Sequence, residues 1–181
     1  MNGLAGAVAW AVVPFVPEAP FRLYAGEGHA PVEVDDPGRL IAAARKGSDS
    51  EFTFLVPGKA RPVLVVSDRI DERLGELIAL RLLRLGALTA REREIVRSSE
   101  DPGLYHLDPE RFDLPEENAA IVAALVRVHL SAIDLQPVGR LGPDELRVVH
   151  ERVATYYGLD LRELVRRELQ RLAAAQRRRR D

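Results

Sequence analysis

The stretch Lys59-Ala-Arg-Pro-Val-Leu-Val-Val-Ser67 decides the fold. It opens with charged residues and runs into four consecutive apolar residues, Val63 to Val66, three of which are β-branched. A continuous apolar run of this length is typical of a strand that is buried on both faces. A shorter strand-like run, Phe52 to Val56, precedes it across a Pro57-Gly58 turn. We therefore expect a strand over Arg61 to Val66 at the centre of a sheet.

The next apolar stretch, Leu74 to Leu85, is ambiguous. Its leucine, alanine, arginine and glutamate content favours a helix by propensity. Its short length and the Gly86 that closes it suit a strand, so the residues leave both alternatives open. The charged segment that follows, Thr89 to Ser99, is predicted to be a loop or an exposed arm.

The remaining elements are several strands followed by helices. Pro143 fits a first helical position and Gly158 a helix stop, so a helix is expected between them. Asp160 can cap a second, basic helix. Because no strand and helix alternate along the chain, the order indicates a small, mainly β domain of the α+β or barrel-like class. The other expected strands are Trp10 to Val16, Tyr105 to Asp108 and Ala120 to Leu130, with a turn at Pro115 to Asn118.

The segment from Pro20 to Ser50 is rich in glycine and proline and contains one short helical phrase, Pro37 to Gly47. We expect an insertion in the domain here. The predicted organisation is a barrel domain over residues 1–158 with an insertion at 20–50, followed by a basic helical extension over 159–181.

The net charge of −2 over 181 residues hides a segregation of charge. Residues 59–97 carry nine basic and six acidic side chains, whereas residues 98–150 carry four and ten. Residues 151–181 are again basic. A polyanionic partner is therefore expected to meet residues 59–97 or 151–181, because the other segments repel phosphate.

Several kinds of chemistry have no counterpart in the sequence. The chain has no cysteine, which excludes disulfides, thiolate metal sites and cysteine nucleophiles. It has no phosphate-binding glycine loop and no Gly-x-Ser-x-Gly elbow, so we expect no cofactor. The histidines lie too far apart for metal-ligand spacing, and no metal is expected. The neighbouring acids Glu116 and Glu117 are interpreted as solvated carboxylates of a turn.

Three of the four histidines invite a specific interpretation. His150 lies four residues after Leu146 on the apolar side of its helix, so we expect a partly buried histidine with a satisfied hydrogen bond. His106 and His129 fall on two expected strands, where pairing would allow them to meet.

The apolar opening, Met1 to Pro17, lacks the positively charged start of an export signal. It is also shorter than the ~20 residues that a membrane-spanning helix needs. We therefore expect a cytoplasmic protein with no membrane partner.

Four phrases of the chain resemble the MazF/PemK family of bacterial toxin–antitoxin systems. The most persuasive is the late phrase Arg140-Leu-Gly-Pro-Asp-Glu-Leu146 in its family order. The others are Gly6 to Phe15 for the first strand, Lys59 to Ser67 for the signature strand, and Leu107 to Pro115 before a strand with Val126-Arg127-Val128. The resemblance covers about two thirds of the chain.

The resemblance implies an SH3-like β-barrel with a C-terminal helix, to which the basic extension adds a further helix. It also implies that Leu77 to Leu85 is a strand, against propensity. The implied protein is a homodimer, is paired with an antitoxin protein, and cuts single-stranded RNA without a metal ion. Arg61 matches the family arginine that helps activate the ribose 2′-hydroxyl and stabilises the charged phosphorane.

Lys59, Arg81 and Arg84 are the candidate RNA-binding residues, because they lie in the basic segment around Arg61. The chain departs from the family at its catalytic threonine or serine, since Arg81 and Arg84 are the only polar side chains of the strand over 77–85. An alternative function follows from this missing hydroxyl: a catalytically silent barrel that binds a protein partner or, like the related gyrase poisons, a large enzyme.

Overall fold

A computed structural model describes residues 3–14, 23–25, 32–34, 38, 41–42, 45–46, 52–54, 58–67, 70–71, 73–160, 163, 165–166 and 169–171. The chain forms two compact units, one made of Met1–Val12 with Ala60–Asp181 and the other of Val13–Lys59. The larger unit contains a mainly β sheet with helices, so the expected α+β class is confirmed.

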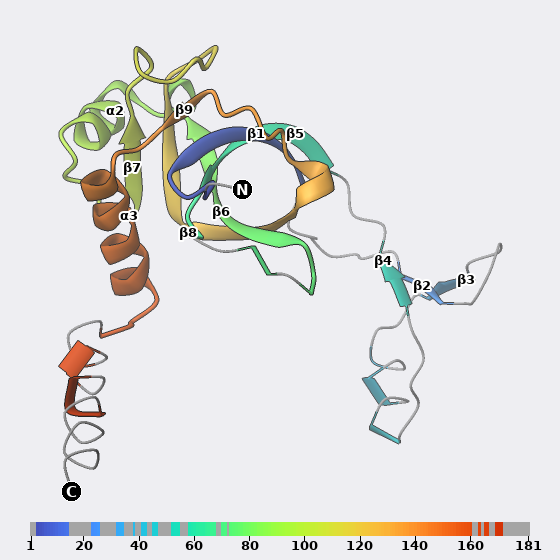
Figure 1. The fold of residues 1–181 in the computed structure, drawn as a ribbon. Helices are drawn as coiled ribbons and strands as arrows, with labels where there is room; N and C mark the ends of the chain where they lie inside the picture. Colours follow the sequence, from blue (N-terminus) through green and yellow to red (C-terminus); the bar gives the residue numbers. More distant parts are fainter. Residues whose placement is uncertain are drawn as a thin grey trace, which may run out of the picture. The chain divides into compact units, whose positions relative to one another are not determined.

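A curled six-stranded sheet is the centre of the larger unit. Its strand order is β7-β8-β6-β5-β1-β9. The pairs β5 with β6, β6 with β8, β7 with β8 and β1 with β9 are antiparallel. Figure 1 shows β1, β5, β6 and β8 curling round into a ring, with β7 beside the helices. The strands are β1 (Ala7–Pro14), β5 (Gly58–Val65), β6 (Glu76–Arg84), β7 (Leu104–Leu107), β8 (Asn118–His129) and β9 (Gly139–Arg140).

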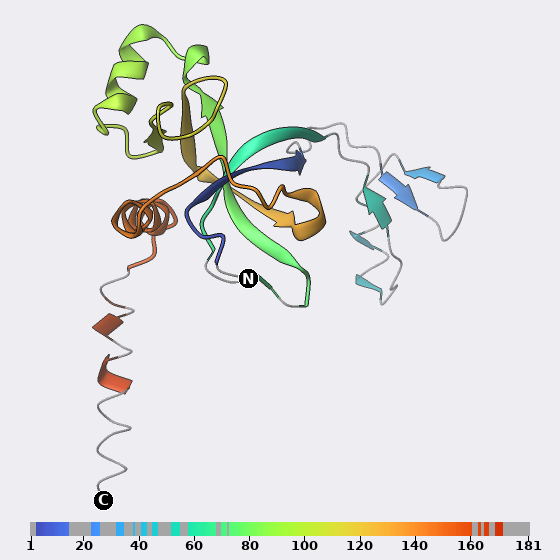
Figure 2. The same ribbon diagram turned by 45° about the horizontal axis from the view of Figure 1, so that its top comes forward.

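The two faces of this sheet are covered by different helices. The helix face is the one whose buried side chains cluster with Val149 of α3 (Pro143–Tyr156). The reverse face carries a smaller cluster in which Val96 of α2 (Ala90–Arg97) packs against Leu85 and Ala119. The sheet next to β7 therefore lies between the two helices (Figure 2). The strand residues of the helix-face cluster include Leu64, Val66, Leu80, Leu82, Leu107 and Ala120.

The ambiguous stretch after β5 is a strand, as the family resemblance implies and against its helix propensity. β6 pairs with β5 through Leu64↔Leu80 and with β8 through Leu77↔Val128. Leu77 and Leu80 are almost completely buried. Hydrogen bonding on both edges and burial on both faces outweigh the propensity difference, which is only a few tenths of a kcal/mol per residue.

The prediction of a loop or exposed arm over Thr89 to Ser99 is wrong, because residues 90–97 form α2. The side chain of Thr89 accepts a hydrogen bond from the backbone N–H of Glu92, and the Glu92 carboxylate accepts one from the N–H of Thr89 at 2.8 Å. This reciprocal capping box satisfies two backbone donors at the helix start. A short 3₁₀ turn, η1 (Leu85–Ala87), leads from β6 into it.

The expected C-terminal helix is confirmed as α3, with Pro143 at its start and Gly158, at φ +68°, just beyond its end. Beyond it, Glu163, Val165, Arg166 and Leu169–Arg171 are helical. The Asp160 carboxylate accepts a hydrogen bond from the N–H of Glu163 at 2.9 Å, as expected of a helix cap.

The expected strands near Trp10, Tyr105 and Ala120 correspond to β1, β7 and β8, with bounds that differ by a few residues. β8 begins at Asn118, earlier than expected, and ends in the turn η2 (Leu130–Ala132). β9 packs closely on the loop after β7, because a Cβ at Gly139 would lie 2.3 Å from the Phe112 ring.

The smaller unit contains a three-stranded antiparallel sheet of order β3-β2-β4, formed by β2 (Leu23–Ala25), β3 (Val32–Val34) and β4 (Phe52–Phe54). The strand expected at Phe52 is therefore present, but it pairs with β2. Within the expected helical phrase, Gly38, Ile41, Ala42 and Arg45 are helical. None of the described helices is long and apolar enough to cross a membrane.

Candidate nucleic-acid interface

Two of the candidate residues, Lys59 and Arg61, lie on strand β5. Its opening residues Gly58 to Ala60, Lys59 among them, are exposed, and its burial increases from Val63 onward. Arg61 lies between these two parts and is half-buried. A long cation at the point where a strand leaves the core can keep its charged head in water while its stem packs on apolar neighbours.

Arg81 of β6 lies on the reverse face together with Arg61. Val63 and Arg81 are directly opposite each other across β5 and β6. Directly opposite residues share a face, and Arg61, two residues from Val63, shares that face too. Arg61 and Arg81 therefore lie on the same face of two adjacent strands, with Arg61 two residues beyond Val63↔Arg81, the last pair that joins β5 to β6.

An irregularity in the β6–β8 pairing leaves no β8 residue opposite Arg81. On the β8 side the register jumps from Leu80↔Leu125 to Leu82↔Ala120, so Arg81 has no partner on β8. Irregularities of this kind bend a strand and redirect side chains, and they are frequent beside functional sites. The side chain of Arg81 forms no ion pair or hydrogen bond with the residues that the structure describes.

Arg84 is separated from this pair. Strand alternation puts it on the helix face, at the end of β6, opposite Asn118 of β8. Its guanidinium lies 3.0 Å from the carboxylate of Glu116, and both side chains are largely exposed. Exposed ion pairs of this kind contribute about 0–1 kcal/mol, so the contact is easily exchanged for a phosphate.

The reverse face also carries a histidine–carboxylate–arginine group that sequence reasoning missed. Nε2 of His106 on β7 lies 2.8 Å from Oε1 of Glu117, and Arg97 of α2 donates to both oxygens of that carboxylate, from Nε at 2.8 Å. The side chains of His106 and Glu117 are each about one-fifth exposed. These three residues are called the His106 cluster below.

The interpretation of Glu117 as a solvated turn carboxylate is wrong. The hydrogen bond from Arg97, followed by that from His106, lowers the pKa of Glu117 to about 2 against the opposing effect of burial. The charged form is therefore stabilised and Glu117 is ionised at all ordinary pH values. The capping pattern Thr89-x-x-Glu92 was the available signal, because it predicts the helix that brings Arg97 to this carboxylate.

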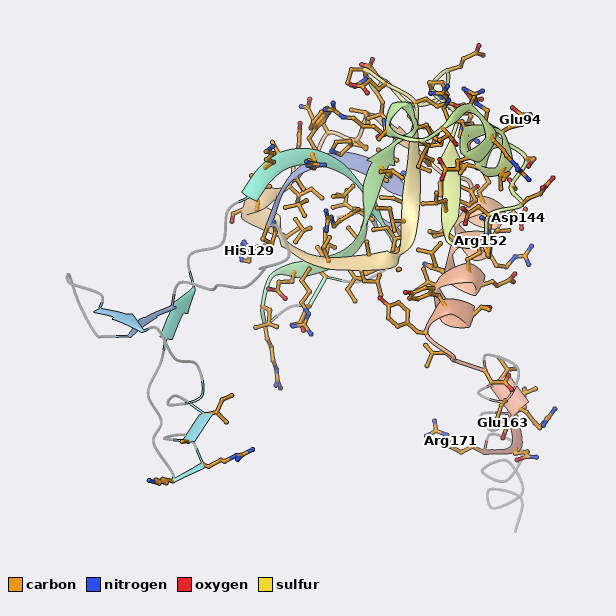
Figure 3. All side chains as sticks on the ribbon, turned by 180° about the vertical axis from the view of Figure 1, so that it is seen from behind. Glu94, His129, Asp144, Arg152, Glu163 and Arg171 are labelled. Atoms are coloured by element: carbon orange, nitrogen blue, oxygen red, sulfur yellow. The ribbon has the colours of Figure 1, made fainter. Side chains whose placement is uncertain are left out.

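His129 and His150 have structural roles, and His106 and His129 do not meet. His106 pairs with Ala119 near the start of β8, whereas His129 ends that strand and pairs with Glu76. Figure 3 shows His129 far from Glu94 of α2. Nδ1 of His129 accepts from the N–H of Ser131 at 3.1 Å. His150 is half-buried and its Nε2 donates to the carbonyl of Val66 at 2.7 Å, which confirms the expected satisfied histidine.

Strand β6 carries no hydroxyl beside the two arginines. Within β6 the polar side chains are Glu76, Arg81 and Arg84, with no hydroxyl. The hydroxyl of Ser67, just after β5, accepts a hydrogen bond from the N–H of Ile78 at 3.0 Å and so closes the strand connection. Among the described residues, no three acidic or histidine side chains gather in a way that could hold a metal ion.

Comparison with known proteins yields a distant likeness to solved structures. No family model matches the sequence, and neither does any curated protein. Among solved structures, the Mycobacterium tuberculosis toxin MazF-mt6 is similar to this chain with 14% sequence identity and a TM-score of 0.43. The matched region covers 56% of this chain and 90% of that toxin.

Proposed function

We propose that this protein is a toxin-type endoribonuclease that cleaves single-stranded RNA on the reverse face of its sheet, without a metal ion. The observation that carries the proposal is the register of β5 and β6, which brings Arg61 and Arg81 together on one face beside a break in the sheet. Two guanidinium groups on one face suit the successive charges of a phosphodiester backbone.

Arg61 is assigned the catalytic role. In the reaction the ribose 2′-oxygen forms a bond to phosphorus, the bond from phosphorus to the 5′-oxygen breaks, and a 2′,3′-cyclic phosphate and a 5′-hydroxyl result. Negative charge accumulates on the phosphorane oxygens at the transition state. A guanidinium is always charged and donates two parallel hydrogen bonds, so Arg61 stabilises this charge most where it is largest.

Arg81, Lys59 and Arg84 are assigned to binding. Arg81 is half-buried on the same face as Arg61, where it would hold a neighbouring phosphate. Lys59 is exposed at the start of β5 and would hold a flanking phosphate. Arg84 is exposed on the helix face at the end of β6, where it would hold a phosphate only of RNA that continues past that strand end. As in the family that the sequence resembles, we propose that the protein acts as a homodimer and that an antitoxin protein holds it in check.

The test uses purified full-length protein and labelled single-stranded RNA of varied sequence in the presence of EDTA. Cleavage is expected, and Arg61→Ala is expected to lower its rate 10²- to 10³-fold. Arg61→Lys keeps the charge but loses the two-pronged geometry, so a partial loss is expected. Arg127→Ala is the matched control, because Arg127 is a well-exposed arginine paired with Glu76 on the helix face.

Mass spectrometry of the products identifies the ends. Terminal 2′,3′-cyclic phosphate supports attack by the 2′-hydroxyl. Absence of cleavage by wild-type protein across all RNAs overturns the nuclease and leaves the protein-binding alternative. Equal losses in Arg61→Ala and Arg127→Ala would show that the assay follows overall charge and not the proposed site.

A further inference from the structure

We propose that strand β8 pairs edge to edge with β8 of a second copy of this chain, about a two-fold axis that passes through Val126. The inference assigns a surface to the homodimer of the proposed function and rests on that part of it. It does not rest on the RNA chemistry, because none of the residues of this surface belongs to the proposed RNA-binding set.

One edge of β8 is open along the second half of the strand. β7 pairs with Asn118 to Ile121 only, whereas β6 runs along the other edge as far as His129 (Figure 1). Among the described residues, no strand pairs with the β7 edge of β8 beyond Ile121. An unpaired edge presents a row of N–H and C=O groups that can bind another strand.

The backbone groups of Leu125 and Arg127 point out of this edge. Ile78 is opposite Arg127, and its carbonyl accepts a hydrogen bond from the N–H of Val66, on the β5 side, at 2.9 Å. Opposite residues of an antiparallel ladder either bond to each other or both point away. The N–H and C=O of Arg127 therefore point away from β6, as do those of Leu125, two residues earlier. No hydrogen bond to these groups is present in the described part of the chain.

Tyr157 limits the open part of the edge on the side of β7. Its hydroxyl donates to the carbonyl of Ala123 at 3.1 Å, so that carbonyl is already bonded. At the other end β8 runs into the turn η2. The open groups in the middle of the edge are therefore those of Leu125 and Arg127.

A second β8 fits these open groups in one register. When Leu125 is opposite Arg127 of the second copy, each such pair exchanges two hydrogen bonds, and the two-fold axis passes between the two Val126 residues. With the axis at Leu125, Arg127 would be opposite Ala123, whose carbonyl is occupied. With the axis at Arg127, two like charges would be directly opposite each other, which is destabilising. The open groups and the charge therefore both select the axis at Val126.

The side chains beside this edge are apolar and exposed, which suits a second copy. Leu125 and Ile78 lie on the helix face and are 37% and 45% exposed, and Tyr157 at the end of α3 is 47% exposed. A two-fold axis at the edge brings the two helix faces side by side, so Leu125 would pack on the aliphatic stem of the second copy's Arg127. The guanidinium of Arg127 lies 3.6 Å from the carboxylate of Glu76 and remains in water. Pairing therefore covers apolar surface without burying a charge.

The first experiment measures the mass of the full-length protein by analytical ultracentrifugation over a range of concentrations, and a dimer is expected. Arg127→Pro removes the outward N–H and leaves the pairing with β6 in place, because that N–H does not face β6. One hydrogen bond is lost on each side of the axis, so the dissociation constant of the dimer is expected to rise at least ~10-fold. Arg127→Ala is the matched control. It removes the side chain but keeps the N–H, and it is expected to remain dimeric.

The second experiment exploits the absence of cysteine from the chain and does not depend on the folding of Arg127→Pro. Val126→Cys introduces a single thiol that faces its own copy across the axis, with the two Cα atoms about 4.5 Å apart. A disulfide can span this distance, so oxidation is expected to give a covalent dimer. Ala124→Cys is the matched control. Ala124 would be opposite Val128 of the second copy, so this variant is expected to stay uncross-linked.

The outcomes separate this inference from the proposed nuclease. A wild-type protein that stays monomeric at all concentrations overturns the pairing and leaves the edge to a strand of another protein or to the chain's own extension. A dimer that persists unchanged in folded Arg127→Pro uses another surface and overturns the inference, although the homodimer stands. Cross-linking of Ala124→Cys as readily as Val126→Cys overturns it as well. Neither measurement uses RNA, so an absence of RNA cleavage contradicts the nuclease alone.

Discussion

The two ends of strand β8 are held in different ways. At its first end, Asn118 to Val122 lie between α2 and α3, and the neighbouring Glu117 carries three charge-assisted hydrogen bonds. At its last end, Leu125, Arg127 and His129 are exposed on the helix face beside Ile78. The first end is buried and is flanked by the charged side chains of the His106 cluster, whereas the last end contributes mainly strand pairing. Substitutions are therefore expected to be costly at the first end and mild at the last.

The largest expected difference is in core packing, between the cluster under α3 that includes Ala120 at the first end of β8 and the exposed last end of the strand. Phe112 is almost fully buried in the cluster under α3, and Phe112→Ala is expected to lower the free energy of unfolding by about 3–5 kcal/mol. Leu125→Ala, at the last end of β8, removes a side chain that is 37% exposed and is expected to cost well under half as much. Urea denaturation followed by tryptophan fluorescence measures both. Similar losses in the free energy of unfolding of the two variants would contradict the difference in packing between these regions.

A smaller and pH-dependent difference is expected at Glu117. Glu117→Gln removes the charge on which Arg97 and His106 converge, at about 1.5–3 kcal/mol near neutral pH. Because the native pKa of Glu117 is about 2 and its usual value is 4.5, the stabilisation is complete above about pH 5. It is lost as pH falls from 4.5 toward 2, so the two proteins converge in acid. Denaturant titrations at several pH values measure this.

Glu116→Gln is the matched control for this titration. Glu116 adjoins Glu117 in sequence but pairs only with the exposed Arg84. Its loss is expected to cost less than 1 kcal/mol at any pH. A gap between wild type and Glu117→Gln that persisted unchanged to pH 2 would contradict the depressed pKa.

Much of the fold could be predicted from the sequence because the residues that indicate each strand or helix lie within that element or next to it. The apolar run at Val63 to Val66, Pro143 at a helix start and Gly158 at its end each carry their own physical reason. β6 is the instructive exception, since residues 76–84 are good helix formers. Their strand conformation depends on β5 and β8, which lie far away in sequence.

The candidate site was less predictable because it depends on register. Arg61 and Arg81 are twenty residues apart, and only the pairing of Val63 with Arg81 shows that they share a face. The contact of His106 with Glu117 likewise requires the β7–β8 pairing and the position of α2. α2 itself was within reach of sequence reasoning, since Thr89 and Glu92 have the spacing of a capping box.

The smallest expected effect comes from a substitution that weakens α2, which packs on the first end of β8, without changing β8 itself. Thr89→Ala removes the cap of α2, at about 1 kcal/mol, without touching the His106 cluster. Because α2 carries Arg97, fraying of the helix weakens the hold on Glu117, and hydrogen exchange is expected to speed up at Arg97 and at the start of β8. Exchange at the last end of β8 is expected to stay unchanged, since local opening spreads only through elements that pack together. Uniform acceleration along β8 would show that its two ends open as one unit.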